Sequence, residues 1–307
     1  MIKPSKRKDV RRADRIFFWG LRSLSGLLVL ALVSMGYFLF DASELAIQKN
    51  GFISFVLSTD WDPVQDIYGA LPVIFGTLVS SFLSLVIAFP LSLGIALFLN
   101  EIAPAKTARV VGFLVEMLAA IPSVIYGLWG IFVLVPWLRA HVQPFFISNL
   151  GFLPLFQGPA YGVGMFSAGF ILSLMILPTI SSIAREVFAA IPRIQRESAL
   201  ALGATRWEMI KLAVIKSSKG GLFGAMMLGL GRALGETMAV TMVIGNRAQI
   251  VSSLFAPAQT MASVIANEYA EATSDIHLSS LALVGFLLFL VTFLTSSVAR
   301  ILVWRVK

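Results

Sequence analysis

The feature that most constrains this chain is the stretch Ile67–Asn100, which contains no Asp, Glu, Lys or Arg. A helix needs about 20 mostly apolar residues to cross the hydrocarbon core of a bilayer. Comparable runs recur along the chain, so that 58% of its 307 residues are hydrophobic and only 13% are charged. Soluble domains carry about twice that share of charge. The composition therefore excludes a soluble enzyme and a disordered protein, and it predicts an all-α integral membrane protein.

Six segments are apolar and long enough to span a membrane. We expect them at about Ser23–Phe40, within Ile67–Asn100, and at about Val110–Pro136, Tyr161–Ala184, Gly220–Ile244 and Ser279–Val303. Three of them contain an internal proline, Pro90, Pro122 or Pro178. Proline removes a backbone N–H and kinks a helix, which helices in membranes tolerate.

The positive charges predict the orientation of these spans. Of the 24 Lys and Arg residues, 20 lie in the tail up to Arg22, the loops 101–109 and 185–219, and the C-terminal end. Only three lie in the alternate loops, which carry acidic residues instead. Cytoplasmic loops are enriched in Lys and Arg, so both termini are expected in the cytoplasm. The net charge of +8 then reflects topology rather than binding to nucleic acid.

No internal repeat divides the chain, which we interpret as one membrane domain. Residues 1–66 would form a basic cytoplasmic tail, an uncleaved first span and an external loop. Residues 67–307 would form a five-helix core that includes the cytoplasmic loop 185–219. The chain has no cysteine, two histidines and no phosphate-binding loop, so we expect no metal site and no cofactor on this chain. His277 is expected to be solvated near an external loop.

Residues 185–219 form the only sizeable cytoplasmic loop, and this loop is amphipathic. Ile194, Leu200 and Leu202 favour one short helix, and Trp207 with the apolar residues after it favours a second. Gly203 lies between them, where the chain must turn. Two short helices at a bend expose an apolar and basic surface, which predicts a partner with a matching groove. The alternative is an ordinary amphipathic helix at the membrane surface.

The segment Glu197-Ser198-Ala199, followed by Gly203, resembles the EAA loop of the permease subunits of ABC importers. Two departures are Ser198 in place of Ala and Lys216 in place of a proline at the far end. In that family the loop forms a coupling helix, which sits in a cleft of the ATPase subunit and transmits its closure. The resemblance implies that Glu197, Ala199 and Gly203 are coupling residues.

Arg232 and Glu236 lie near the middle of the expected fifth span, in GLGRALGETMAV. A charge at the bilayer centre costs about 2.5–3.5 kcal/mol on insertion scales. The spacing of four residues would place both side chains on one helix face, where they can pair. One interpretation is a structural ion pair that fixes helix packing. The other is an anion path, in which the Arg232 guanidinium contacts the oxygens of an oxyanion and Glu236 neutralises it when the path is empty.

Several further segments resemble the permease family of phosphate-specific ABC importers. They are DWDPVQDIYGALPVIFGT (60–77), EMLAAIPSVIYGLWGIFVLVP (116–136), MILPTI (175–180), LALGATRWE (200–208) and RALGETMA (232–239). Through these segments the resemblance extends from about Trp61 to the C-terminus. The resemblance implies a type I importer (MetI-like) permease fold in a bacterial inner membrane. It also implies a sister permease, an ATPase dimer that holds ATP and Mg²⁺, and an external phosphate-binding protein. In the family, the arginine and glutamate that match Arg232 and Glu236 are implicated in phosphate passage.

Two weaker candidates for the path are Thr237, beside Glu236, and Ser123, after Pro122. Each has a hydroxyl at membrane depth that can instead bond its own helix or pack against a neighbour. Two rival functions stay open. One is a permease for another oxyanion, such as phosphonate, sulfate or molybdate. The other is a membrane enzyme or a channel, which would need more polar residues in the spans than this chain offers.

Overall fold

The computed structural model describes residues 4–306, and all regular structure in this range is helical. This confirms the all-α fold that the sequence predicts. The five segments that are long and apolar enough to cross a membrane, among the residues described, are Phe17–Ala42, Leu71–Ile102, Ser123–Leu150, Met165–Ala189 and Asp275–Ile301. They belong to α1 (Pro4–Ala42), α4 (Leu71–Leu97), the helical run that starts with α6 (Ser123–Trp129), α9 (Met165–Ala189) and α15 (Asp275–Val306).

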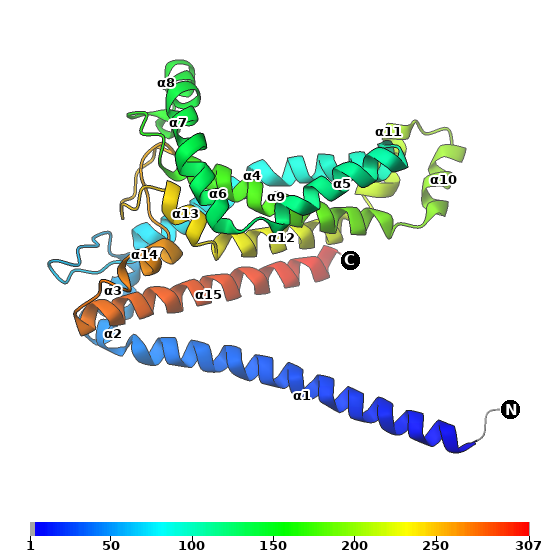
Figure 1. Cartoon of the computed structure of the whole chain (residues 1–307), viewed down its shortest axis with the longest axis horizontal. Helices are drawn as coiled ribbons and strands as arrows, with labels where there is room; N and C mark the ends of the chain where they lie inside the picture. The colour runs from blue at the N-terminus through cyan, green and yellow to red at the C-terminus, as the bar shows by residue number, and fades with distance from the viewer. Residues whose placement is uncertain (1–3, 307) are drawn as a thin grey trace.

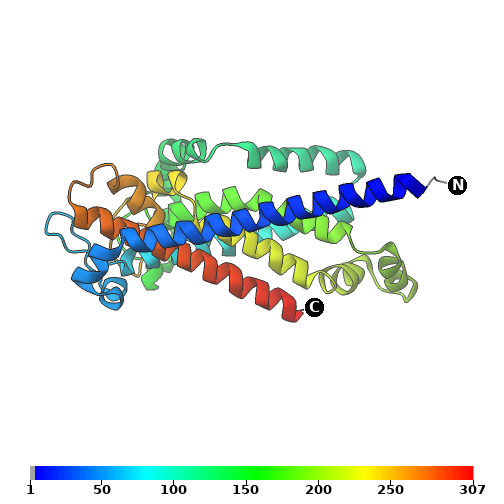
Figure 2. The same ribbon diagram turned by 90° about the horizontal axis from the view of Figure 1, so that it is seen from below.

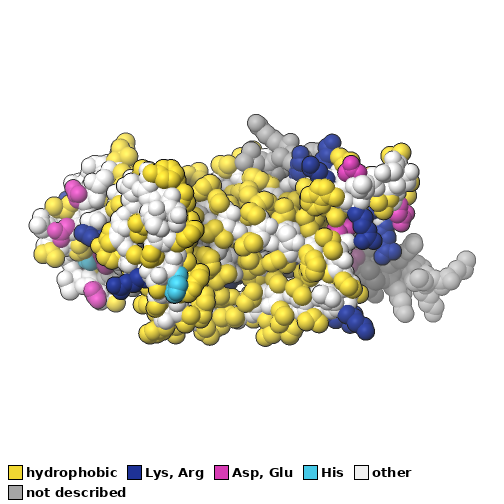
Figure 3. Space-filling view, turned by 90° about the horizontal axis from the view of Figure 1, so that it is seen from above, with side chains coloured by type: hydrophobic (Ala, Val, Ile, Leu, Met, Phe, Trp, Pro, Cys, Tyr) yellow, Lys and Arg dark blue, Asp and Glu magenta, His cyan; other side chains and the backbone are white. Residues whose placement is uncertain are grey.

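The long helices run between two ends of the molecule (Figure 1). One end holds the short helices α2 (Glu44–Asn50), α3 (Phe52–Leu57) and α14 (Met261–Glu268). The other holds α10 (Arg193–Ala201) and α11 (Arg206–Met209), and both α1 begins and α15 ends on this side (Figure 2). Figure 3 shows hydrophobic side chains over the middle of the molecule and charged ones toward the two ends. This distribution matches a chain embedded in an apolar layer.

The centre of the fold is the packing of α4 along α9, with α12 (Lys219–Leu234) against both. Small residues line this contact and let the backbones approach closely, as in other membrane helix pairs. Gly169 of α9 faces Leu83 of α4, and Gly229 of α12 faces Ile180 of α9. The Ser92 hydroxyl of α4 donates a hydrogen bond of 3.0 Å to the Leu177 carbonyl of α9. Both helices continue through their internal prolines, Pro90 and Pro178.

The expected third span, Val110–Pro136, is not one helix. Helix α5 (Ala105–Ala120) ends before Pro122, and α6 begins at Ser123. Proline restricts the residue before it to extended backbone, and Ile121 indeed has φ −71° and ψ 126°. The proline therefore breaks the helix where the sequence predicted a kink. The helical run from α6 continues through π-helical turns, α7 (Val135–Trp137) and α8 (Gln143–Leu150), so it extends beyond the expected end at Pro136.

The expected fifth span, Gly220–Ile244, is also broken. Helix α12 ends at Leu234, and the next helix, α13, is Met238–Val243. Gly235 and the two residues after it separate the helices, and neither helix alone is long enough to count among the five apolar spans. Six continuous spanning helices are therefore not confirmed.

Helix α1 lies beside the core rather than within it. Only 6% of its apolar window is buried, and its contacts are mainly with α15 and α2. Gly36 of α1 lies against the Phe289 ring of α15, and the Ser279 hydroxyl of α15 donates to the Ala42 carbonyl at 2.8 Å. The first span thus joins the rest of the chain chiefly at one end, as an accessory helix would.

The packing predicts that Gly76 of α4 tolerates no larger residue. A methyl group on Gly76 would collide with the Gln259 carbonyl oxygen, so Gly76→Ala must displace backbone and should cost about 1–3 kcal/mol of stability. Gly94→Ala is the matched control, because the same helix leaves open space there. Thermal unfolding of the purified protein in detergent should show a lowered midpoint for Gly76→Ala alone. Equal midpoints for the two variants would contradict this packing.

Candidate functional site

The break between α12 and α13 positions the charged residues of the expected fifth span. Arg232 lies in the last turn of α12, about 20 Å along the helix from Lys219 at 1.5 Å per residue. That depth is well inside a hydrocarbon core of about 30 Å. The Arg232 side chain is exposed on this chain. Among the described residues, no hydrogen bond or ion pair involves its guanidinium.

Glu236 does not pair with Arg232 as the helical spacing predicted. Because the helix ends at Leu234, the two side chains do not share one helix face. The Glu236 carboxylate instead accepts a weak hydrogen bond of 3.4 Å from the Ala239 N–H in the first turn of α13. Thr237 directly precedes α13, and its hydroxyl donates to the Gly235 carbonyl at 3.4 Å. Both side chains therefore make their hydrogen bonds to backbone groups at the break between α12 and α13.

The structure brings the other broken helix to the same region. Gly127 of α6 lies against Ala239 and Met242 of α13, too close for a side chain. Tyr126 of α6 donates a hydrogen bond of 2.9 Å to the Leu118 carbonyl of α5, across the other break. Ser123 is half-buried at the start of α6. Two helix breaks thus lie next to each other beside an arginine at membrane depth.

The expected coupling loop has the predicted shape. Helix α10 ends at Ala201, Gly203 has a left-handed backbone with φ +87°, and α11 follows at Arg206. Thr205 and Glu208 begin α11 with a capping box: the Glu208 carboxylate accepts two hydrogen bonds from Thr205, both 2.8 Å, and the Glu208 N–H donates to the Thr205 hydroxyl at 3.3 Å. These hydrogen bonds stabilise the charged form and hold the pKa of Glu208 below its usual range.

Two of the three residues expected to couple to an ATPase line one hollow of about 730 Å³, and the third, Glu197, lies outside its lining. Ala199 and Gly203 line it, and Glu197 is exposed on the same helix, α10. Leu202, beside Gly203, is 89% exposed, an unusual position for leucine unless another protein covers it. The loop therefore presents an apolar surface with a concave centre.

Sequence reasoning missed two polar clusters. Arg196 of α10 pairs with Glu101 at 2.8 Å. The one sequence signal for this pair was Glu101 itself, an acidic residue directly after the uncharged stretch Ile67–Asn100. His277, expected to be solvated, is 8% exposed and lies 3.0 Å from the Glu268 carboxylate, which also accepts from the Trp61 indole. No local sequence pattern joins Trp61 to Glu268, which is 207 residues away.

Residues 92–307 match the family described as binding-protein-dependent transport system inner membrane component. A relative from Mesorhizobium japonicum is 45% identical over 99% of this chain and 95% of its own length. Another from Pasteurella multocida is 50% identical over 83% of this chain and 80% of its own. Both are named phosphate transport system permease protein PstC.

The chain belongs to this family. Its members are transport components of the membrane rather than enzymes.

Solved structures show the same fold. The alginate ABC importer of a bacterium gives a TM-score of 0.62 with 18% identity, over 99% of both chains. The inward-facing MetNI methionine ABC transporter gives 0.58 with 18% identity, over 81% of this chain and 100% of that one. At this identity the likeness concerns the fold alone. It supports the MetI-like permease fold.

The capping box predicts a pH-dependent stability of α11. Thr205→Ala removes the hydroxyl that accepts from the Glu208 N–H, so that amide should exchange its hydrogen severalfold faster. Because the folded-state pKa of Glu208 is lowered, protection of α11 should be full at neutral pH. It should be lost as the pH falls through that lowered value, below the usual Glu range near about 4.3.

Hydrogen exchange monitored by mass spectrometry would measure both effects. Ser198→Ala is the control, since Ser198 is exposed on α10 and its hydroxyl makes no hydrogen bond within the described residues. Unchanged exchange in Thr205→Ala would show that the box does not hold α11.

Proposed function

We propose that this chain is one of the two membrane subunits of an ATP-driven importer of inorganic phosphate. The observation that carries the proposal is the 45–50% identity to permeases named for phosphate transport, over most of the chain. The chain would form half of the translocation path and perform no chemistry itself. ATP and Mg²⁺ would be bound by a partner ATPase.

The proposed topology has six crossings, with α12 and α13 together forming one of them and both termini in the cytoplasm. In support, α1 begins and α15 ends on the side of α10 and α11 (Figure 1), and 20 of the 24 Lys and Arg residues lie in the segments assigned to that side. The membrane would be the inner membrane of a bacterium. The partners would be a sister permease, an ATPase dimer and an external phosphate-binding protein.

The proposed path passes the break between α12 and α13. A guanidinium in an apolar layer needs a partner or water, and Arg232 has none within the described chain. A non-helical backbone at membrane depth is tolerated where it is covered by protein or lines a polar cavity. Both requirements are met if the Arg232 side chain and residues 235–237 face a path that the sister subunit completes.

The same residues offer a basis for selecting phosphate over sulfate. Arg232 supplies a planar fork of donors for two oxyanion oxygens. Glu236 and the Thr237 hydroxyl lie at the break, and a carboxylate accepts a hydrogen bond only from an anion that carries a proton. Phosphate retains a proton near neutral pH and sulfate does not, so Glu236 would favour phosphate. Ser123 would add a hydroxyl from the neighbouring helix.

The first test is phosphate uptake by cells that lack their own phosphate importers and carry this chain with its partners. Arg232→Gln removes the charge and should reduce uptake at least about tenfold, as expected for loss of a charged hydrogen-bond partner. Arg247→Gln is the matched control, because Arg247 is exposed in a loop. Excess sulfate or phosphonate should leave wild-type uptake unchanged.

Equal uptake by wild type and an assembled Arg232→Gln variant would show that Arg232 has only a packing role. Absence of phosphate uptake by an assembled wild-type complex would overturn the phosphate assignment. Competition by sulfate, molybdate or phosphonate would favour a permease for that other oxyanion.

The second test concerns coupling through α10. Glu197→Lys reverses an exposed charge on the proposed ATPase contact and should either release the ATPase subunit or abolish transport. Asp14→Lys makes the same reversal on α1, away from the loop, and should do neither. Copurification of the ATPase subunit and phosphate uptake measure the two effects. A Glu197→Lys complex that retains both would contradict the coupling role.

A further inference from the structure

Helix α10 has no buried side chain, although it is the expected contact for the ATPase. An exposed helix of nine residues is not stable by itself in water. Something must therefore hold α10 in a fixed orientation on the membrane helices if its movement is to reach them. Apolar packing supplies only part of this, through the partly buried Ala199.

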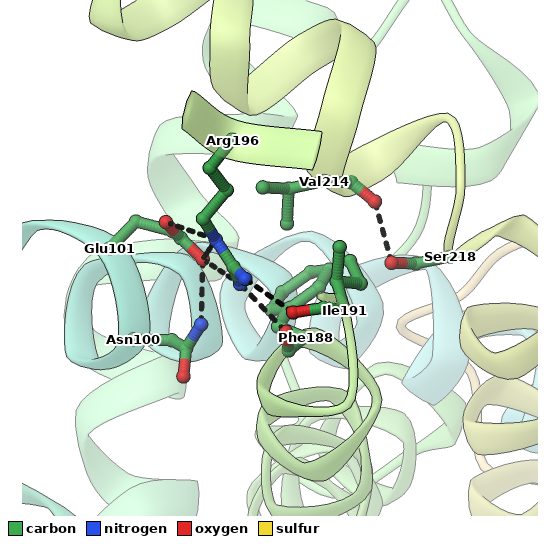
Figure 4. Close-up of polar contacts among 7 residues, drawn as sticks. All are labelled: Asn100, Glu101, Phe188, Ile191, Arg196, Val214 and Ser218. Carbon is green, nitrogen blue, oxygen red and sulfur yellow. Dashed lines mark hydrogen bonds and ion pairs between the residues drawn. The ribbon is translucent and has the colours of Figure 1, made fainter. Parts of the chain in front are cut away.

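The side chain of Arg196 supplies the remaining attachment of α10 to the membrane helices (Figure 4). Its guanidinium reaches from α10 to Glu101, which lies in the π-helical turn Phe98–Ile102 at the end of α4. The Nη2 to Oε1 distance is 2.8 Å, and Nε lies 3.3 Å from both carboxylate oxygens. The side chains are only 17% and 6% exposed, so water weakens this ion pair far less than an exposed one.

The same guanidinium also holds the end of α9. Nη1 donates to the Ile191 carbonyl at 2.6 Å, and Nη2 donates to the Phe188 carbonyl at 2.8 Å. Helix C-termini leave backbone carbonyls without intrahelical partners and carry partial negative charge. Arg196 thus satisfies two carbonyls and one carboxylate at once, which uses the planar fork that lysine lacks.

Within the described residues, these are the only hydrogen bonds that join the α10 side chains to any other helix or to the α9 end. Glu101 has one more contact, an accepted hydrogen bond of 2.6 Å from the Asn100 amide. The guanidinium of Arg196 is therefore a joint between three elements: α10, the end of α4 and the end of α9.

We propose that the Arg196–Glu101 pair is the element that makes α10 move together with α4 and α9. This inference rests on the proposed function and extends it from the surface of the loop to its attachment. Because α4 and α9 form the centre of the fold and α12 packs on both, a displacement of α10 through this joint reaches the helix that carries Arg232. Arg196 and Glu101 act as positioning residues and touch neither phosphate nor nucleotide.

The test measures phosphate moved per ATP hydrolysed, using the complete complex in lipid vesicles with its external binding protein. Arg196→Gln and Glu101→Gln should each lower this ratio about tenfold, within the usual range of coupling between sites. The ATPase subunit should still copurify, because its proposed contact residues are unchanged. A role limited to folding would reduce the amount of complex but leave the ratio of the assembled complex unaltered.

Three comparisons make the result decisive. Arg193→Gln, an exposed arginine on the same helix, should keep the wild-type ratio. The double variant Arg196→Gln with Glu101→Gln should be no worse than Arg196→Gln alone, because Arg196→Gln already removes the contact that Glu101→Gln removes. Arg196→Lys should retain part of the ratio, since lysine keeps the ion pair but loses the fork.

Glu101→Gln leaves the bonds from Arg196 to α9 in place, so it serves as the test if Arg196→Gln fails to assemble. A wild-type ratio in an assembled Glu101→Gln or Arg196→Gln complex would overturn the inference. Losses that multiply in the double variant would also overturn it, because the two residues would then act separately. A wild-type complex that moves no phosphate would overturn the proposed function, and this inference with it.

Discussion

The structure depends on one constraint: in a hydrocarbon layer every backbone N–H and C=O must be hydrogen-bonded within the protein. Long helices meet this constraint at nearly every residue, and α4 and α9 stay helical through Pro90 and Pro178. Places where a helix stops inside the layer are therefore informative. Within the described residues, two of the expected spans are interrupted, at Ile121–Pro122 and at Gly235–Thr237, and the helices that begin there, α6 and α13, lie against each other. The position of these breaks beside Arg232 is what makes a polar path physically reasonable at this depth.

The ion pairs among the described residues lie toward the two ends. At one end, Glu268 joins His277, nine residues away, to Trp61, 207 residues away. At the other, Arg196 joins α10 to the ends of α4 and α9. The middle is held instead by glycines, serines and apolar side chains, since close backbone approach replaces the hydrophobic effect between helices in lipid. The closely packed pair of α4 and α9, with polar contacts at its ends, is suited to transmit a movement of α10 across the membrane.

The sequence predicted the helical class, four of the spans within a few residues of their observed positions, and the bend at Gly203. These features follow from local signals: apolar length, and a glycine that allows positive φ. The spans expected at Val110–Pro136 and Gly220–Ile244 are each broken rather than continuous, for different reasons. Pro122 is a local signal, but a proline can either kink a helix or break it, and the sequence alone does not distinguish the two. The break at Gly235 has no decisive local signal, since the sequence Leu-Gly-Glu-Thr is compatible with a helix. The packing of α6 against α13 is a contact between distant segments that the sequence does not reveal. The Arg196–Glu101 contact joins residues 95 positions apart, which no local pattern reveals.

The central claim is that phosphate passes the break between α12 and α13. The absence of cysteine from this chain allows a direct measurement, because Thr237→Cys would place one thiol at the break. Its rate of reaction with a small hydrophilic thiol reagent would be followed in the assembled, ATP-hydrolysing complex, against a background of the unsubstituted complex. The account predicts that the thiol reacts and that phosphate slows the reaction while sulfate does not. A thiol that never reacts, or one whose rate phosphate leaves unchanged, would contradict the account.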